Sequence, residues 1–266
     1  MMLEAALSVP PATPWARRFV AESFYDRHMC GRFVAAATAS EIADYFDAVV
    51  DTDELPSRYN VAPTQDVYVV VSTAAGVRSI DAFHWGLVPS WAKSESGSAR
   101  RINARVETAA DRPMFAGLFA HRRCIVPANG FYEWQRRSSG TRQPYFIADE
   151  SVPFLALGAI WTAWHTRIDG VGQVLRSVAI LTTAADESLL AVHTRMPVTI
   201  DRSDWDRWLN PHEGDTSELS ALLSAPAGAN WSIHPVSDEV NSSRHEGPQL
   251  IAAIQPPVVP EAGQLF

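Results

Sequence analysis

The chain has 266 residues, 47% of them hydrophobic, which is enough to bury the core of a single domain. Its formal net charge of −8 argues against a protein that coats nucleic acid through its overall field, and no run approaches the roughly eighteen apolar residues of a membrane span. The only two cysteines, Cys30 and Cys124, exclude a disulfide framework and a paired-cysteine zinc site, and they fit a soluble protein of the reducing cytoplasm.

Residues 1–29 are predicted to form an extension outside the fold. Three prolines and Glu4 interrupt any apolar stretch there, so the segment is not typical of a secretory signal. One domain is expected over residues 30–254. The remaining segment, 255–266, is predicted to be a loose proline-rich tail, because proline cannot donate to a sheet ladder.

Within the domain, short segments rich in β-branched and aromatic residues alternate with turns that contain glycine, proline or polar residues. They predict strands over residues 66–72, 77–85, 122–134, 144–148, 154–164 and 174–183. Helical patterns are shorter, and they predict helices over residues 40–46 (capped by Ser40), 185–192, 204–209 and 217–223. The expected fold is a single α+β domain, mostly antiparallel β with a few peripheral short helices.

Charge is unevenly distributed along the chain. Ten basic and four acidic residues lie between Lys93 and Arg142, so this window carries +6 and leaves −14 for the rest. A basic patch on an acidic body suits a protein that grips a short length of phosphate backbone. An arginine-rich solvated surface without a ligand explains the same charges, and the sequence leaves both interpretations open.

The segment Met29 to Phe33 (MCGRF) lies at a boundary in the chain. The sequence before it is not typical of a globular domain, and the sequence after it is. Removal of everything through Met29 would make Cys30 amino-terminal, with a thiol of ordinary pKa about 8.5 and an α-amine of pKa about 7.7–8.0. Such an amine attacks an aldehyde to give an imine, and the thiol then closes a five-membered thiazolidine. The alternative for Cys30 is a buried cysteine that packs as a small hydrophobe, the role assigned to Cys124.

Two further residues are candidates for proton transfer. Glu133 lies between Tyr132 and Trp134, and an apolar wall there would raise its pKa toward the range useful for an acid or base. His193 precedes Arg195 by two residues, which suits a general acid or base beside a phosphate-binding guanidinium. Each has an ordinary alternative, a surface glutamate and a hydrogen-bonded structural histidine.

The segment Ile102 to Thr108 (INARVET) is strand-like, and Asn103, Arg105 and Glu107 would share one of its faces. The amide of Asn103 suits a sugar or an amine, and the guanidinium of Arg105 suits phosphate. Glu107 would neutralise Arg105 in the simplest alternative, and a structural asparagine in a turn explains Asn103 equally well.

Two tryptophans in WGLVPSW, Trp85 and Trp91, are candidate platforms for stacked bases, and each such contact is worth roughly 1–3 kcal/mol. With nine tryptophans in the chain, most must pack in the core instead. The seven histidines other than His193 show no close pairing with one another or with cysteine, so we expect neither a metal site nor a cofactor.

In this order, the motifs resemble those of the SOS response-associated peptidase family, whose members are also described as abasic-site processing or shielding proteins. The resemblance runs from Cys30 to about Ile251 and rests on MCGRF, RYNVAPTQ, WGLVPSWA, INARVET, RRCIVPANGFYEW, ALGAIW, ILTTAAD, HTRMP and VNSSRHEGPQLI. It implies a domain built around a curved, barrel-like antiparallel sheet, with a basic groove for single-stranded DNA. We expect a cytoplasmic monomer, associated with the nucleoid when bound to DNA.

The resemblance also implies roles for individual residues. Cys30, once amino-terminal, forms a thiazolidine with the aldehyde of an abasic site. Asn103 lies beside the adduct, Glu133 transfers protons, and His193 assists sugar-ring opening and reversal of the cross-link. The implied phosphate contacts are Arg32, Arg105 and Arg195, and Thr182 is a weaker candidate beside His193. With Trp85 and Trp91 from the aromatic segment, these residues make up the expected DNA contacts. The family is named for a peptidase activity that removes the residues ahead of the cysteine.

The extension departs from the family pattern, because members begin with Met-Cys and here 28 residues precede Met29. Either translation starts at Met29 or the extension is removed by self-cleavage. With the extension in place, Cys30 has no free amine. Two other functions compete with the DNA cross-linker: a cysteine peptidase that uses Cys30, Glu133 and His193 on protein substrates, and a non-covalent single-strand binder that uses the basic window.

Overall fold

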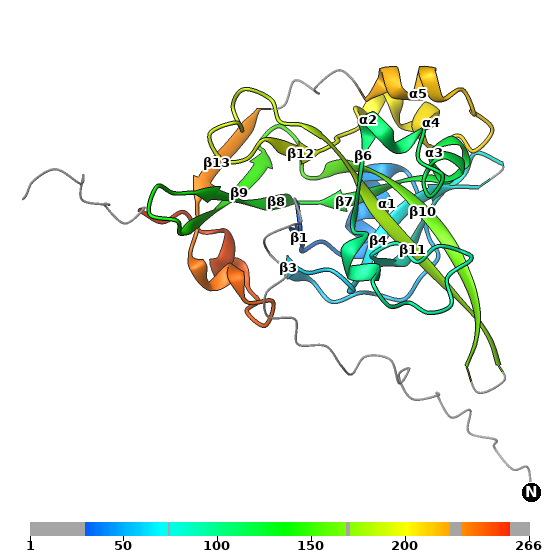
Figure 1. Ribbon diagram of the computed structural model, residues 1–266, viewed down its shortest axis with the longest axis horizontal. Helices are drawn as coiled ribbons and strands as arrows, with labels where there is room; N and C mark the ends of the chain where they lie inside the picture. Colours follow the sequence, from blue (N-terminus) through cyan, green and yellow to red (C-terminus); the bar gives the residue numbers. More distant parts are fainter. Residues whose placement is uncertain (1–29, 74, 169–170, 224–229, 256–266) are drawn as a thin grey trace, which may run out of the picture.

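The computed structural model describes residues 30–73, 75–168, 171–223 and 230–255 (Figure 1). The predicted extension, and the predicted tail beyond Gln255, lie outside the described residues. Strands form two sheets, and short helices pack around them. In the described part of the chain, no helix combines the length and the apolar character needed to cross a membrane.

Five strands form a closed barrel. They are β4 (Asp66–Ser72), β5 (Arg78–Trp85), β7 (Arg123–Ala128), β10 (Leu155–Ile168) and β11 (Val171–Ala184). Antiparallel pairing runs in the order β5-β4-β7-β10-β11, and a parallel pairing of β11 with β5, Ser177 opposite His84, closes the ring. The structure therefore confirms an α+β protein with a barrel-like core.

The barrel strands are buried on both faces. Along β4, Val67 and Val69 join one apolar cluster, whereas Tyr68 and Val70 join another. The first cluster continues into the second sheet, and the other continues among the side chains of the helices. Burial on both faces accounts for the near-continuous apolar run of DVYVVVS.

A second, five-stranded sheet is antiparallel throughout and lies beside the barrel (Figure 1). Its order is β13 (Trp231–Pro235), β9 (Arg142–Asp149), β8 (Gly130–Arg136), β1 (Arg32–Ala35) and β3 (Arg58–Val61). This sheet positions the candidate site, because the pairing of β1 with β8 places residues of β8 beside Cys30, which precedes β1.

The chain passes from the barrel to the second sheet at Asn129, between β7 and β8. Asn129 N donates to Val34 O at 2.8 Å, and its Oδ1 accepts from Ala36 N at 2.9 Å. Gly130 follows, where a Cβ would lie 2.4 Å from the ring of Phe146. The prediction of one uninterrupted strand through this segment is therefore wrong, because contacts with the distant β1 break it in two.

The helices are short. Three follow segments that the sequence predicts, namely α1 (Ala39–Phe46), α4 (Trp205–Leu209) and α5 (Thr216–Leu222). The cap of α1 is Thr38 rather than Ser40, because Thr38 and Glu41 exchange hydrogen bonds in a capping box. The other elements are α2 (Val106–Ala109), α3 (Ala116–His121), β2 (Val49–Val50), β6 (Asn103–Arg105), β12 (Arg195–Pro197), and the 3-10 turns η2 (Ser98–Arg100), η3 (Arg202–Asp204), η4 (Asp238–Asn241) and η5 (Pro248–Ile251).

The helix predicted over residues 185–192 does not form, and the segment is a series of turns. Ala185 N donates to Thr194 O at 3.0 Å, so the two ends of the segment are held together as a loop between β11 and β12, and an extended helix cannot return to its own start. Within the loop, the backbone bonds from Leu189 N to Asp186 O and from Val192 N to Leu189 O close short turns. Asp186 Oδ2 accepts from Trp231 Nε1 at 2.7 Å, which ties the segment to β13.

A buried arginine joins the barrel to two helices. Arg123, at the start of β7, is 4% exposed and donates from Nε to Trp208 O at 2.7 Å and from Nη1 to Phe119 O at 3.0 Å. Further bonds reach Ala120 O and Asn210 O. One guanidinium thus satisfies carbonyls at the carboxyl ends of α3 and α4. Burial lowers the pKa of Arg123 to about 10, so it stays charged at neutral pH.

Replacement of Arg123 by methionine is expected to lower the free energy of unfolding by about 3 kcal/mol or more, because buried carbonyls lose a charged donor. Arg122→Met is the matched control, since Arg122 is exposed and only lies over the Trp161 ring, 4.5 Å from its centroid. Urea unfolding of both variants measures the difference. Equal stabilities would contradict the role assigned to Arg123.

Candidate functional site

Cys30 lies two residues before β1 and is buried, at 3% exposure. Its backbone is left-handed, with φ 48°, a conformation uncommon for a residue with a side chain. Cys30 N donates to Glu133 Oε1 at 2.6 Å. The register of β1 with β8, in which Arg32 lies opposite Tyr132, brings the two residues together.

Glu133, on β8, is a carboxyl inside the protein, at 3% exposure. Burial raises its pKa, whereas His193 and the hydrogen bonds from Cys30 oppose the rise. A carboxyl with a raised pKa keeps its proton closer to neutral pH than an ordinary glutamate does. It can therefore donate that proton and take one back in the same reaction.

The Cys30 thiol is influenced by the same carboxyl. Burial raises the pKa of the thiol well above its ordinary value, Glu133 raises it further, and Arg195 opposes both. The thiol is therefore neutral near pH 7. A free α-amine at this residue, with an ordinary pKa of about 7.7–8.0, is the nucleophile available first.

His193 completes a group of three with Cys30 and Glu133. Its Nδ1 lies 4.0 Å from Glu133 Oε1 and accepts from Arg195 N at 3.1 Å. The same Nδ1 lies 3.1 Å from Arg195 O. The turn ahead of His193 is fixed to β8 by Gln135, whose Nε2 donates to Ala191 O at 2.8 Å.

Arg195, the first residue of β12, is already paired in the free protein. It donates to Thr182 O at 2.7 Å and to Thr182 Oγ1 at 3.2 Å, and it forms a two-point ion pair with Glu107. The ion pair lowers the pKa of the Glu107 carboxyl. A carboxylate thus occupies the position that a phosphate would take on Arg195.

Asn103 and Arg105 come from β6, which pairs in parallel with β11 so that Arg105 lies opposite Thr182. Asn103 is half-buried and Arg105 is exposed. Helix α2 begins directly after Arg105, so Glu107 does not continue the strand face as predicted. Its carboxylate reaches Arg195 instead of simply neutralising Arg105.

Three of the residues expected to contact DNA are buried in this structure. Arg32 is 1% exposed and donates to Asn60 Oδ1 at 2.6 Å and to Val240 O at 3.1 Å. Trp85 is 0% exposed and donates to Ile102 O, and Thr182 is also 0% exposed. These side chains hold the fold together. Their positions close to the motifs in sequence did not indicate that they face the protein interior.

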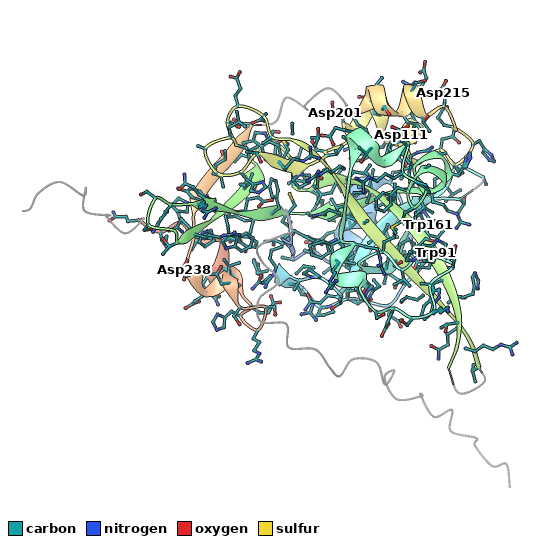
Figure 2. All side chains as sticks on the ribbon, in the orientation of Figure 1. Trp91, Asp111, Trp161, Asp201, Asp215 and Asp238 are labelled. Carbon is teal, nitrogen blue, oxygen red and sulfur yellow. The ribbon has the colours of Figure 1, made fainter. Side chains whose placement is uncertain are left out.

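Trp91, by contrast, is 73% exposed. Its indole lines an open depression of about 460 Å³ together with Arg112, Pro113 and Met114. Figure 2 shows Trp91 and Trp161 toward the same end of the molecule, with Asp238 at the other. Pro113 and Met114 were not predicted as site residues, because a short irregular segment has no periodicity that marks it.

The basic window divides into separate groups in the fold. Arg123 is internal, as described above. Three arginines lie in the β8–β9 hairpin of the second sheet, where Arg136 and Arg142 face each other and Arg137 follows β8. The remaining window residues lie on the segments between β5 and β7, which also carry Trp91.

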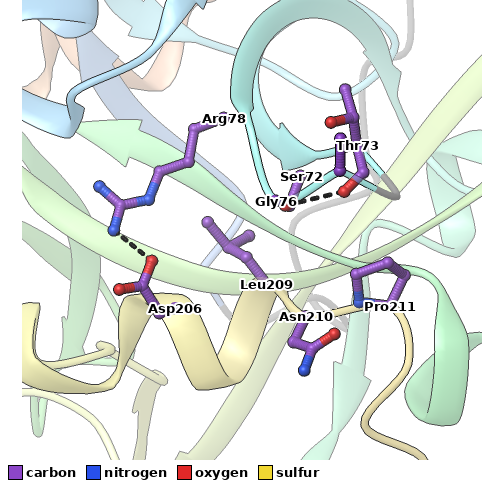
Figure 3. Close-up of a pocket in the computed structure, with 9 residues that line it drawn as sticks. Ser72, Thr73, Gly76, Arg78, Asp206, Leu209, Asn210 and Pro211 are labelled. Atoms are coloured by element: carbon purple, nitrogen blue, oxygen red, sulfur yellow. Dashed lines mark hydrogen bonds and ion pairs between the residues drawn. The ribbon is translucent and has the colours of Figure 1, made fainter.

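A second depression, of about 500 Å³, lies between the β4–β5 turn and α4 (Figure 3). Arg78 donates to Asp206 Oδ1 across it at 2.6 Å, so its principal charges are already paired. It contains none of the predicted site residues. Among the described residues, no group of three or more histidine, cysteine or carboxylate side chains is arranged to hold a metal ion.

Proteins of known identity resemble this chain over most of its length. "Abasic site processing protein YoqW" of Bacillus subtilis (strain 168) is 34% identical over 225 residues, which are 84% of this chain and 99% of that protein. "Abasic site processing protein YedK" of Escherichia coli (strain K12) is 33% identical, over 85% of this chain and all of that protein. "Abasic site processing protein HMCES" of Xenopus tropicalis is 30% identical, over 77% of this chain and 68% of that protein.

Solved structures share the fold. A Bacteroides thetaiotaomicron protein superposes with a TM-score of 0.75 at 22% identity, over 85% of this chain and all of that one. A Bordetella bronchiseptica protein gives 0.66 at 21% identity, over 78% of this chain and all of that one. The family model described as "SOS response associated peptidase (SRAP)" matches residues 29–243. Because that match covers most of the chain, this protein belongs to the SOS response associated peptidase (SRAP) family.

Proposed function

We propose that this protein processes abasic sites, and that Cys30, once amino-terminal, forms a thiazolidine cross-link with an abasic site in single-stranded DNA. Its relatives are named for abasic-site processing. The observation that carries the proposal is the 2.6 Å hydrogen bond between Cys30 N and the buried Glu133 carboxyl. It sets a proton-transfer group against the nitrogen that attacks the aldehyde.

The chemistry proceeds in two steps. The neutral α-amine of Cys30 adds to the aldehyde carbon of the ring-opened abasic sugar, and the protonated Glu133 gives its proton to the departing hydroxyl, so that water leaves and an imine forms. The thiol then adds to the imine carbon, its proton passes through Glu133 to the imine nitrogen, and the ring closes. One water molecule is lost overall. The neutral thiol accounts for the amine acting first.

His193 and Asn103 serve the sugar in this proposal. His193, 4.0 Å from Glu133, exchanges protons with the sugar hydroxyl during ring opening and during reversal of the cross-link. Asn103, on β6, uses its amide to hold the amine or the adduct. Both roles require the sugar to enter between β6 and the turn that carries His193.

DNA contacts in the proposal fall to exposed or displaceable groups. Arg105 is exposed, Arg195 meets a phosphate when Glu107 gives way, and Trp91 offers its ring to an unstacked base. Arg112 lies beside that ring and suits the adjoining phosphate. The protein acts as a monomer on DNA in the cytoplasm.

Self-processing belongs to the same proposal. In the full 266-residue chain, Cys30 N is a peptide nitrogen, and hydrolysis of the Met29–Cys30 bond requires a proton on it. Glu133 lies within hydrogen-bond distance of that nitrogen. The same carboxyl therefore serves first the release of the amine and later its reaction with the aldehyde.

Protein expressed from Met29, with that methionine removed, is expected to give a denaturation-resistant complex with an oligonucleotide that carries one abasic site. Without a reducing agent, Cys30→Ala should give none. Cys30→Ala and Cys30→Ser both keep the amine but not the thiol, so each should give a complex only when borohydride reduces the imine. A stable complex with Cys30→Ala in the absence of a reducing agent, or none with the native cysteine, would sink the proposal.

The full chain is expected to cross-link only after the residues before Cys30 are removed, because the amine is otherwise an amide. Intact mass of the purified chain over time measures that removal. Glu133→Gln should retain the extension under conditions in which the native chain loses it. Loss of the extension at the same rate in both would show that Glu133 takes no part in its removal.

Glu133→Gln, in protein that begins at Cys30, is expected to slow cross-linking by about 10²–10⁴-fold, the usual contribution of a general acid or base. In the native protein the rate falls as pH rises through the pKa of Glu133, where its proton is lost. Because burial raises that pKa, the decline lies above the range of an ordinary glutamate. A pH–rate profile that keeps this decline in Glu133→Gln would contradict the assignment.

Glu107→Gln is expected to tighten non-covalent binding of single-stranded DNA, because Arg195 loses the carboxylate that competes with phosphate. Each additional phosphate that is neutralised steepens the dependence of log affinity on log salt by about 0.7 on a single strand. Fluorescence anisotropy over a salt series measures both quantities, with Arg105→Gln as the variant expected to change them in the opposite direction. Weaker binding by Glu107→Gln would mean that Glu107 positions Arg195 for DNA.

A further inference from the structure

Trp91 lies on a loop, residues 86–101, that leaves the barrel at the end of β5 and returns to it at β6. The two ends of this loop are fastened to each other. Leu87 N donates to Arg101 O at 2.9 Å, and Arg101 Nε donates to Leu87 O at 2.9 Å. The loop therefore has a closed base from which its exposed part projects.

The base of the loop is also fastened to the barrel. His84 Nε2 and Ser98 Oγ are 3.2 Å apart, and both residues are buried. Gly86 has φ 137°, and a Cβ there would lie 2.8 Å from Ser98 O, so only glycine allows this close approach. Val88 N donates to Ser177 Oγ of β11 at 2.9 Å. The base is thus a fixed part of the fold.

The exposed part of the loop is anchored to β10. Trp164 Nε1 donates to Ala92 O, next to Trp91, at 2.7 Å. Beyond Ile160 the pairing of β10 with β7 has ended, and β10 and β11 continue past the barrel as a two-stranded arm (Figure 1). Trp164 lies on this arm, opposite Leu175.

We propose that the β10–β11 arm braces the DNA-stacking platform, with Trp164 as a positioning residue that holds Trp91 ready for an unstacked base. The inference rests on the proposed function in one respect, namely that Trp91 stacks on DNA. It assigns a role to a part of the molecule that the cross-linking chemistry does not use.

The physical reason is pre-organisation. A stacking ring on an untethered loop must lose conformational freedom when a base binds, and that loss weakens binding. Trp164 fixes the backbone at Ala92 through a rigid side chain that has only two torsions. The cost of ordering the loop is then met on folding, and the full stacking energy is available to the base.

The test is a double-mutant cycle on the full chain, with an undamaged single-stranded oligonucleotide so that the Cys30 chemistry is not involved. Trp164→Phe keeps the aromatic ring but loses the donor, and it should weaken binding about fivefold, the equivalent of one hydrogen bond. Trp91→Ala should weaken binding about 5- to 150-fold. In Trp91→Ala the change at Trp164 should have no further effect, because there is no ring left to position.

Two controls accompany the cycle. Trp161→Phe changes a tryptophan of the same strand that packs on Phe83 and Arg122, and it should bind like the native chain. The slope of log affinity against log salt should be unchanged in Trp164→Phe, since no bond to phosphate is lost. If Trp164→Phe unfolds, Trp164→Tyr provides a second variant that keeps an aromatic ring and loses the indole donor to Ala92 O.

Native-like binding by Trp164→Phe, or a full additional loss in the double variant, would overturn the brace while leaving the stacking role of Trp91 intact. Native-like binding by Trp91→Ala would overturn both, because the platform itself would not touch DNA. Neither result bears on cross-linking by Cys30, which the abasic oligonucleotide tests separately.

Discussion

The hydrogen bond from Cys30 N to the Glu133 carboxyl is the contact on which the candidate site depends. A buried carboxyl is costly unless its oxygens are bonded, and Glu133 obtains its partners from Cys30 and has His193 nearby. The three residues come from the segment just before β1, from β8 and from the turn before β12. No two of these segments are neighbours in sequence, so the site exists only when both sheets are assembled.

The position of Cys30 is in turn fixed by residues that touch no substrate. Arg32, two residues on, donates to Asn60 and to Val240 O, and the Asn60 amide donates to Ser242 O at 2.9 Å. The carboxyl-terminal segment VNSSRHEG thereby clamps β1 and β3 from the far end of the chain. The clamp gives the segment VNSSRHEG, one of the motifs of the sequence analysis, a structural role. Arg32 stays charged within the clamp although burial lowers its pKa to about 10.

The sequence predicted much of the local structure and part of the site. The strands around residues 66–72 and 174–183 follow from β-branched runs, because local pattern and burial agree there. The helix predicted over residues 185–192 was wrong because the bond from Ala185 N to Thr194 O brings the two ends of the segment together as a loop. The parallel pairing of β5 with β11, which closes the barrel, could not be predicted from the sequence, because it joins strands about a hundred residues apart.

Candidate site residues with a distinctive reactive group were easier to predict than residues whose role depends on the direction in which the side chain points. The chemistry of an amino-terminal cysteine singles out Cys30, and the apolar neighbours of Glu133 indicate its burial. Whether Arg32 or Trp85 points outward depends on the register of sheets that no local pattern encodes. The pairing of Arg195 with Glu107 arises because helix α2 starts one residue after β6, a detail that a strand-like pattern conceals.

The burial of the Cys30 thiol has a consequence for its reactivity toward oxidants. Peroxides and alkylating agents react with exposed thiolates, and this sulfur is neutral and lies in a residue that is 3% exposed. In the proposed function, the thiol has to remain reduced among the oxidants that accompany DNA damage. Its burial and its raised pKa both slow oxidation, so the residue proposed to react with the aldehyde is also one that the fold protects from oxidants.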